Sequence, residues 1–397
     1  MKTGMKTISS SKLPRVLVIN SAKKWVGEAE HTFNLISGLL SRKVRTILVC
    51  RKGYGLEQEA INRGIEHYTV LMKGKFTGIH DLFDFLELRR IIKKHRINLV
   101  HCHRGKDHWL SACVKCSFLF SKPRLIRTRH VTVPVKRHIF NRWLYKYSTD
   151  DVIAVSEEAA GSLKGLPLRH APHIIYAAVD AEKFSPGKRS ADLRRQCGIP
   201  EDMPEAPLIG LIGRIQTVKG QQILIRAMKE ILETIPEARF VIAAKSSERK
   251  LKRPERLAKK LGVEDKIHIT GHFENIEELV ASLDVGVVAS LGSEGSSRIT
   301  MEYMASGVPV VATMVGGIPE ILEGGRLGTL VSPNNAEELS SAVSNTILNR
   351  DQAMKKAEAA LQKARTFLTL DRFMDQTLGV YQSVLKNRGE APPYSSY

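Results

Sequence analysis

The sequence predicts an α/β protein built from two doubly wound parallel sheets, and three observations support that prediction. The 397-residue chain is long enough for two domains of ordinary size. In each half, short apolar runs alternate with amphipathic stretches of helical period. A stretch that contains Pro186 and Gly187 and has no clear periodicity separates the halves. We therefore expect a first domain over residues 1–185 and a second over residues 186–370.

The first half begins with a buried strand at Arg15–Asn20 and continues through a turn at Gly27 into a helix. The apolar side chains of that helix are Phe33, Leu35, Ile36, Leu39 and Leu40. A second helix over Ile79–Lys94 has four apolar side chains at core spacing, namely Leu82, Phe85, Leu86 and Leu88. Further strands are expected at Thr46–Cys50, Asn98–His101, Leu125–Thr128 and Asp151–Val155.

The second half repeats this alternation. An amphipathic helix over Gln221–Thr234 stops before Pro236. The last helix, near residues 371–386, follows the second sheet, and we expect the tail over residues 387–397 to be disordered. Strands are expected at Leu208–Gly213, Arg239–Ala244, Lys266–Thr270, Val285–Ala289 and Val308–Ala312.

Charge is distributed unevenly along the chain. Residues 1–190 carry 35 Lys and Arg against 15 Asp and Glu, whereas residues 191–397 carry 26 of each. The whole excess of +20 therefore belongs to the first half. Such a field attracts an anionic glycolipid, an anionic membrane or a nucleic acid, although a solvated basic face without a partner is the alternative. No nucleic-acid module signature accompanies it, so we expect no specific nucleic acid partner.

Composition also bears on the compartment. No apolar run approaches the roughly 20 residues of a membrane helix, and the start of the chain lacks the apolar core of a secretory signal. Five cysteines, an odd number scattered over a long chain, argue against a disulfide framework. The Cys113-Val-Lys-Cys116 pair lacks a second pair to complete a zinc site. We expect a cytoplasmic protein, either free or peripheral on the cytoplasmic face of the inner membrane.

The stretch from Glu294 to Glu320 carries most of the functional information. Two carboxylates, Glu294 and Glu302, bracket the start of a helix that feeds a buried strand and then the Gly316-Gly317 turn. The helix N-terminus offers unpaired N–H groups and a positive dipole end to a diphosphate. Glu302, two turns on, can reach groups beside that diphosphate. This pattern is typical of a nucleotide-sugar site.

These residues resemble a known family. Glu294-x7-Glu302, followed by Met-Ala-x-Gly-x-Pro-Val-Val-Ala, is similar to the retaining glycosyltransferases of family 4 with the GT-B fold. Gly213-Arg214, with Lys219-Gly220 after four residues, resembles that family's Gly-Arg-x4-Lys-Gly element. The resemblance implies two Rossmann-like domains facing a cleft, with the last helix crossing back to the first domain. The segments around His103 and His130 resemble transferases of lipopolysaccharide core assembly.

The resemblance assigns the donor site to the second domain. It implies that Arg214 and Lys219 neutralise the diphosphate of a nucleotide sugar, with UDP favoured as nucleotide, and that Glu302 accepts the ribose hydroxyls. Glu294 faces the donor sugar in a catalytic role. Ser296 and Ser297 depart from the family's usual Gly-Phe-Gly, and their hydroxyls bind phosphate or cap the helix.

Two further expectations concern glycines and metals at this site. Gly213, Gly316 and Gly317 let the backbone approach the ligand closely. Because no Asp-x-Asp occurs, we expect no metal and no cofactor other than the donor itself.

In the first domain, His130 matches the family's active-site histidine, which touches the donor sugar; a hydrogen-bonded histidine at a strand end is the alternative. Gly27 is the close-approach glycine after the first strand, although Glu28 stands where many members have a second glycine. We expect His103, Arg104 and Lys106 to bind an anionic acceptor, against the alternative of a solvated loop.

The segment Lys136–Tyr147 combines Ile139, Trp143 and Tyr147 on one helical stripe, beside Phe140 and Leu144, with four cations. It suits either a helix that lies on an anionic bilayer or a helix that packs inward.

From the residues and the resemblance together we expect the chain to transfer a sugar from a nucleotide-diphosphate sugar to an anionic, lipid-linked glycan such as lipopolysaccharide core. A nucleotide-sugar epimerase and a non-catalytic nucleotide-sugar-binding subunit are the alternatives.

Overall fold

The computed structural model describes residues 14–25, 27–73, 78–244, 246–271, 273, 275–292 and 294–386. It divides into two compact units, one of residues 1–176 with 370–397 and one of residues 177–369. The tail from Asn387, expected to be disordered, lies outside the described residues. None of the helices in these ranges is long and apolar enough to span a bilayer.

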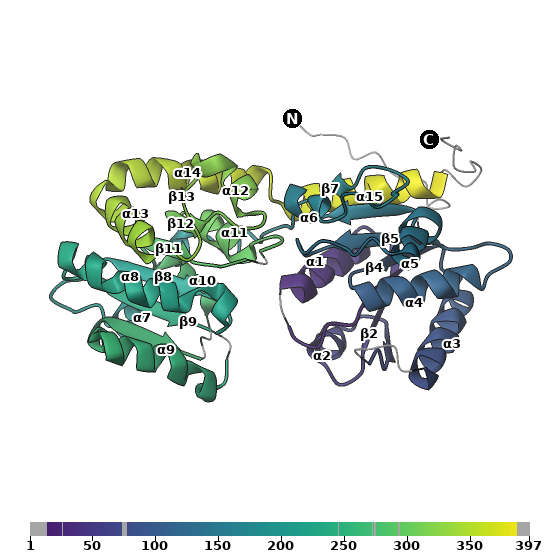
Figure 1. The fold of residues 1–397 in the computed structure, drawn as a ribbon, viewed down its shortest axis with the longest axis horizontal. Coiled ribbons are helices and arrows are strands. Elements are labelled where there is room, and N and C mark those ends of the chain that lie inside the picture. The colour runs from purple at the N-terminus through teal and green to yellow at the C-terminus, as the bar shows by residue number, and fades with distance from the viewer. Residues whose placement is uncertain are drawn as a thin grey trace. The chain divides into compact units, whose positions relative to one another are not determined.

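A parallel sheet forms the centre of the first unit (Figure 1). It has seven strands in the order β3-β2-β1-β4-β5-β6-β7. Right-handed crossovers put α1 and α2 on one face and α3 and α4 on the other. The strands are β1 (Arg15–Asn20), β2 (Arg45–Arg51), β3 (His67–Val70), β4 (Leu99–Cys102), β5 (Arg124–Arg129), β6 (Asp151–Ala154) and β7 (His173–Ile174). The helices are α1 (Gly27–Ser41), α2 (Gly55–Asn62), α3 (Ile79–Lys94), α4 (Gly105–Cys116), α5 (Ile139–Trp143), the π-helix η2 (Leu144–Ser148), α6 (Glu157–Gly161) and α15 (Leu370–Lys386).

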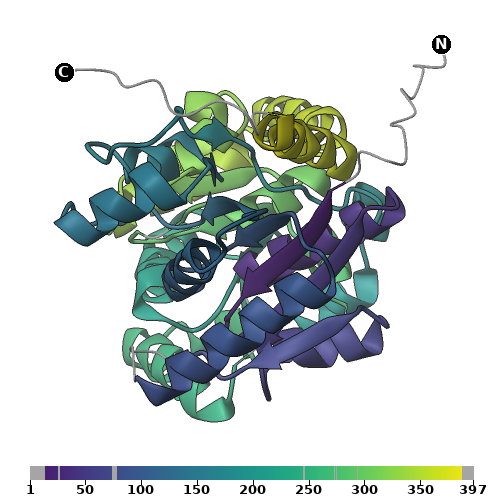
Figure 2. The same cartoon turned by 90° about the vertical axis from the view of Figure 1, so that its right-hand side faces the viewer.

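The C-terminal helix α15 packs in the first unit, as expected for the GT-B fold. Its partner is α1, where Gly38 leaves room for the Met374 side chain: a Cβ at Gly38 would lie 2.4 Å from the Met374 sulfur. The Tyr381 hydroxyl also bonds His101 Nδ1 at 2.6 Å. The helix therefore completes the face of the sheet that α1 covers (Figure 2).

The second unit contains a six-stranded parallel sheet in the order β10-β9-β8-β11-β12-β13, with an apolar core of Ile, Val, Leu and Phe side chains. Its strands are β8 (Leu208–Ile212), β9 (Arg239–Ala243), β10 (Ile267–Thr270), β11 (Val285–Val288), β12 (Val310–Thr313) and β13 (Thr329–Val331). Its α-helices are α7 (Ala191–Gln196), α8 (Gln221–Thr234), α9 (Glu248–Leu261), α10 (Ile276–Ala281), α11 (Arg298–Ala305), α12 (Ile318–Ile321), α13 (Ala336–Leu348) and α14 (Arg350–Thr366). Short 3-10 turns are η3 (Pro186–Lys188), η4 (Thr217–Lys219), η5 (Glu264–Lys266) and η6 (Glu323–Gly325).

Three side-chain expectations are wrong. Leu82 and Leu86 of α3 are 56% and 52% exposed, and of the four predicted core side chains only Leu88 is fully buried. Leu40, in the last turn of α1, is also exposed. The bounds of α3 are as predicted, but its buried stripe turns toward Leu88, Ile91 and Ile92, because those side chains meet α4 and the sheet.

The segment Lys136–Tyr147 contains the short α-helix α5, which is followed directly by the π-helix η2. Leu144 and Tyr145 point inward, whereas Ile139, Phe140 and Tyr147 are 75%, 67% and 56% exposed. The expectation that this segment packs inward is therefore wrong for most of its apolar stripe. The helical period changes at Leu144, so the side chains before and after that residue face different directions.

Candidate active site

The predicted donor residues follow three adjacent parallel strands of the second unit. Strand β8 pairs with β11, and β11 pairs with β12. Between β8 and β11 the strand order reverses, because the chain first runs outward to β10 and then returns. Ligands of open α/β sheets bind at the carboxyl ends of the strands at such a point. Gly213, Glu294 and Gly316 all lie in loops at that edge.

Lys219 and Glu294 are brought together there. The Lys219 ammonium forms an ion pair with the Glu294 carboxylate, although 75 residues separate them in sequence. The Ser290 hydroxyl donates to the same Glu294 Oε1 at 2.6 Å. Glu294 is 6% exposed. The pair thus holds one cation and one carboxylate in fixed positions at the switch point of the sheet.

Two glycines allow this arrangement. Gly220 has φ 72°, and a Cβ there would lie 1.7 Å from the Ala289 carbonyl oxygen. Gly316 has φ 60°, and a Cβ there would lie 1.9 Å from the Glu294 carbonyl oxygen. Gly317 N–H donates to that same oxygen at 2.8 Å. Only glycine fits at Gly220 and Gly316, because other residues combine backbone strain with a clash. The Gly-Gly turn therefore fixes the backbone at Glu294.

Helix α11 begins at Arg298, directly after the residues expected to bind phosphate. Ser297 has left-handed backbone (φ 37°) and bonds Thr300 Oγ1 at 2.6 Å through its hydroxyl, without capping the helix by its side chain. Ser296 is half-buried in the same loop. The expected donor residue Arg214 is exposed at the end of β8, and its carbonyl accepts from Gln221 Nε2 at 2.8 Å.

Glu302 lies one turn into α11. Arg298 Nε donates to its carboxylate at 2.8 Å. Burial raises the pKa of Glu302, whereas the charges of Arg298 and Lys183 oppose that shift. A nearly buried carboxylate held by one arginine is suited to accept hydroxyl donors.

Tyr303 and Thr313 hold this loop and helix in place, although neither was predicted as a site residue. Tyr303 is fully buried, and its hydroxyl accepts from Ile212 N–H at 3.1 Å and donates to the Gly210 carbonyl at 3.2 Å. Thr313 Oγ1 donates to the Ser290 carbonyl at 2.6 Å. An i,i+4 spacing marks Arg298 and Glu302 in the sequence, but Tyr303 depends on tertiary packing and leaves no local signal.

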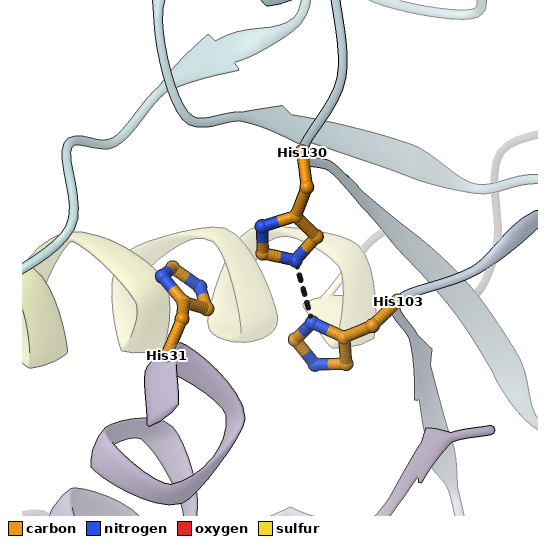
Figure 3. A group of neighbouring side chains, drawn as sticks. All are labelled: His31, His103 and His130. Carbon is orange, nitrogen blue, oxygen red and sulfur yellow. Dashed lines mark hydrogen bonds between the residues drawn. The ribbon is translucent and has the colours of Figure 1, made fainter. Parts of the chain in front are cut away.

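In the first unit, four histidines gather beside β1 and β4, the neighbouring strands at the switch point of that sheet. Figure 3 shows three of them, His31, His103 and His130. His103 Nδ1 and His130 Nε2 are 2.9 Å apart, and the His31 ring meets His130 edge-on at 4.8 Å between centroids. His101 stacks on His103 at 4.7 Å. His103 and His130 were predicted as site residues, whereas His31 and His101 were not.

Burial makes these imidazoles poor bases. It lowers the pKa of His31 to about 4 and that of His101 to about 3. The pKa values of His103 and His130 lie well below the ordinary value for the same reason. The nearby Arg127 charge adds to the shift at His101, His103 and His130. All four rings are therefore neutral near pH 7.

Neutral imidazoles are also metal ligands, and one nitrogen from each of His31, His103 and His130 lies within 4.8 Å of the others. Two features oppose a cation there. His103 and His130 already bond each other at 2.9 Å, and the Arg127 charge that lowers their pKa also repels a metal ion. The geometry of the three imidazoles suits hydrogen bonding to a polar ligand better than it suits coordination of a metal ion.

The predicted acceptor residues are already engaged to different degrees. Lys106 Nζ lies 2.6 Å from Asp81 Oδ1, so an anion would compete with that carboxylate. Arg104 Nη1 lies 3.4 Å from Glu28 Oε2 and is more exposed. At Gly27, the first residue of α1, a Cβ would meet no protein atom within 4 Å. Any close approach at Gly27 would therefore involve a ligand and not the protein.

Two family models match the chain. "Glycosyltransferase Family 4" matches residues 26–183, and "Glycosyl transferases group 1" matches residues 206–349. A D-inositol 3-phosphate glycosyltransferase of Corynebacterium urealyticum is 31% identical over 62% of this chain and 58% of its own length. The lipopolysaccharide core biosynthesis mannosyltransferase LpcC of Rhizobium leguminosarum bv. viciae is 28% identical over 66% of this chain and 75% of its own. The chain spans about half to three fifths of the inositol phosphate enzymes that it matches.

Solved structures agree in fold. A glycosyltransferase of Rickettsia africae ESF-5 superposes with a TM-score of 0.83 at 23% identity, covering 95% of this chain and all of that one. Anabaena Alr3699/HepE in complex with UDP gives a TM-score of 0.80 at 19% identity, covering 93% of this chain and all of that one. The two sheets, the returning C-terminal helix and both matched family models lead to one conclusion: the chain belongs to the group 1, family 4 glycosyltransferases of the GT-B fold.

Proposed function

We propose that this protein transfers a sugar from a nucleotide-diphosphate sugar to an anionic, lipid-linked glycan with retention of anomeric configuration. The observation that carries the proposal is the Lys219–Glu294 pair at the switch point of the second sheet, beside the start of α11. A cation and a carboxylate held there match the needs of a diphosphate leaving group and of an anomeric carbon that gains positive charge.

Each donor residue has a role in this proposal. Arg214 and Lys219 stabilise the charge that develops on the departing diphosphate, as two cations in place of a metal. Glu302 accepts the ribose hydroxyls. Glu294, with its carboxylate already bonded by Ser290 and Lys219, orients the donor sugar or stabilises the positive charge on its anomeric carbon. UDP is the favoured nucleotide, since the Anabaena protein with the same fold binds it.

The acceptor is proposed to be anionic because the first half of the chain carries the whole net positive charge. The names of two relatives point to the same chemistry, one to an inositol phosphate and one to lipopolysaccharide core. Lipopolysaccharide core is the finer assignment that we favour. His130 and His103 contribute neutral hydrogen-bonding groups to the sugars, because neither imidazole is protonated to the cation near pH 7.

We further propose that the exposed stripe of α5 and η2 docks on an anionic membrane at the cytoplasmic face. Ile139, Phe140 and Tyr147 offer exposed apolar side chains, and four cations accompany them: Lys136, Arg137, Arg142 and Lys146. Apolar burial and attraction to anionic lipids act together in such a segment.

Calorimetric titration with UDP tests the donor site. Arg214→Ala should weaken UDP binding about 10- to 100-fold, since a charged hydrogen bond contributes about 1.5–3 kcal/mol. Lys219→Ala should do the same and also remove the ion-pair partner of Glu294, while the Ser290 hydrogen bond stays. Lys229→Ala, an exposed lysine of α8, is the matched control. Wild-type UDP affinity in both site variants would contradict the assignment.

A further inference from the structure

Strand β5 carries two buried arginines that the proposed roles do not use. Arg127 and Arg129 are 4% and 9% exposed. Side chains alternate along a strand, so both lie on the face opposite Thr128, which bonds His101 Nε2. The arginines thus belong to the other side of the sheet from the histidine that meets Tyr381.

The two guanidinium groups differ in their partners. Arg129 Nε donates to Ser162 Oγ at 2.9 Å, and its Nη2 donates to the Val133 carbonyl. The Arg127 guanidinium hydrogen-bonds the Tyr145 hydroxyl and the Cys102 thiol, but its Nε and Nη1 are buried without a hydrogen-bond partner among the described residues. Leaving charged donors buried and unpaired is costly, so a native protein commonly supplies an acceptor from ordered water or from a bound ligand.

A pocket lies beside these donors. Its volume is about 330 Å³, and Arg127, Arg129, Trp109, Asn141 and Tyr145 contribute to its wall. Burial raises the pKa of Tyr145, so its hydroxyl stays protonated. The wall therefore combines two guanidinium groups with a neutral hydroxyl and an indole. All the lining residues belong to the first unit.

We propose that this pocket binds a phosphate monoester, the anionic group of the acceptor, through the fork of Arg127. This inference rests on the proposed function for the identity of the ligand, whereas the site itself rests on the pocket and the unpaired donors. A guanidinium matches phosphate oxygens in a bidentate manner, which an ammonium does not. Glu28 and Asp107 interact electrostatically with Arg127, and burial raises the pKa of both carboxyls while the Arg104 and Arg127 charges lower it, so an anion in the pocket competes with these two side chains for Arg127.

Trp109 gives a local readout. It lines the pocket and stacks on Trp143 at 6.0 Å between ring centroids. We would titrate the full chain, saturated with UDP to occupy the donor site, with inorganic phosphate and with glycerol 3-phosphate. Indole fluorescence and calorimetry would both be followed. We expect one site per chain, with the ester bound more tightly than inorganic phosphate.

Variants distinguish anion binding in this pocket from general attraction of anions to the positive charge of the protein. Arg127→Gln should weaken ester binding about 10- to 100-fold, and Arg127→Lys should fall between it and wild type. Arg90→Gln, a charge-matched change on the surface of α3, should bind as wild type does. UDP affinity should be unchanged in all three, so a failure of the donor assignment and a failure of this site give different results.

Ester binding that depends on Arg127 supports the acceptor site. Equal, Arg127-dependent affinity for inorganic phosphate and the ester supports the pocket but overturns the acceptor as its ligand. No phosphate or ester binding to the wild-type protein, or equal binding to Arg127→Gln, overturns the proposal. The wild-type titration decides even if Arg127→Gln does not fold.

Discussion

Replacing His31 with glutamine should make the first unit less sensitive to acid. His31 is 6% exposed between Phe373 and His130, and burial lowers its pKa to about 4. In the unfolded chain the same imidazole has its ordinary pKa of 6.5. The unfolded state therefore takes up the proton first as the pH falls.

The difference between the folded and unfolded pKa values sets the sign and the size of the change in unfolding free energy with pH. Because the folded pKa is the lower one, the stability is fully present above about pH 6.5 and is lost progressively between pH 6.5 and pH 4. Linkage gives about 2 kcal/mol less stability at pH 5 than at pH 7 for this one residue. His31→Gln removes that term, while the other buried histidines still contribute theirs.

Guanidinium unfolding at pH 7 and pH 5, followed by tryptophan fluorescence, measures the effect. The three tryptophans of the chain, Trp25, Trp109 and Trp143, all belong to the first unit, so the signal reports that unit alone. The loss of unfolding free energy between the two pH values should be about 2 kcal/mol smaller in His31→Gln than in wild type.

His173→Gln is a control with the opposite sign. The hydrogen bond to Asp151 raises the pKa of His173, so its contribution is present below pH 6.5 and lost as the pH rises through the folded pKa. This variant should therefore lose more stability between pH 7 and pH 5 than wild type. An unchanged pH dependence in His31→Gln would refute the buried, neutral state of His31.

Two other predictions concern the donor loop and the membrane surface. Gly316→Ala should abolish most sugar transfer, because its Cβ would lie 1.9 Å from the Glu294 carbonyl oxygen. Gly292→Ala should retain transfer, because its added Cβ meets no described atom within 4 Å. Equal initial rates of the two variants in a transfer assay would contradict this account of the loop. Neutralising the four cations beside α5 (Lys136, Arg137, Arg142 and Lys146) should release the protein from anionic vesicles, at about 1 kcal/mol for each charge removed. Neutralising four exposed cations of α9 instead (Lys252, Arg256, Lys259 and Lys260) should leave flotation unchanged, and equal flotation of both quadruple variants would argue against the docking surface.

The sequence predicts the architecture well because local patterns determine it. Strand β1 and helices α3 and α8 have the predicted bounds, since apolar periodicity and flanking turn residues mark them. Strand β3 was not predicted, because His67–Val70 mixes polar and apolar residues at the edge of the sheet. The outward turn of Leu82 and Leu86 depends on how α3 meets α4, which periodicity alone does not reveal.

The sequence marks the proposed donor residues more clearly than it marks the histidine cluster. Glycine and charge spacing mark Lys219 in one sequence pattern and Glu294 and Gly316 in another, whereas the contact of Lys219 with Glu294 needs the fold. The roles of these residues in donor binding remain predictions. His31 meets His103 and His130 because α1 follows β1, the neighbour of β4 in the sheet. His101 stacks on His103 because side chains two residues apart along a strand point to the same face. The roles of His130 at the donor sugar and of His103 and Arg104 at an anionic acceptor remain predictions.

The most direct test of the central claim is mass-spectrometric detection of sugar transfer. The full chain would be incubated with UDP-, GDP- and ADP-sugars, with and without an anionic glycolipid extract. We predict release of one nucleoside diphosphate together with an acceptor heavier by one sugar, linked with the configuration of the donor. Nucleotide binding without any transfer to the glycolipid would contradict the proposal and favour a nucleotide-sugar-binding protein without catalysis.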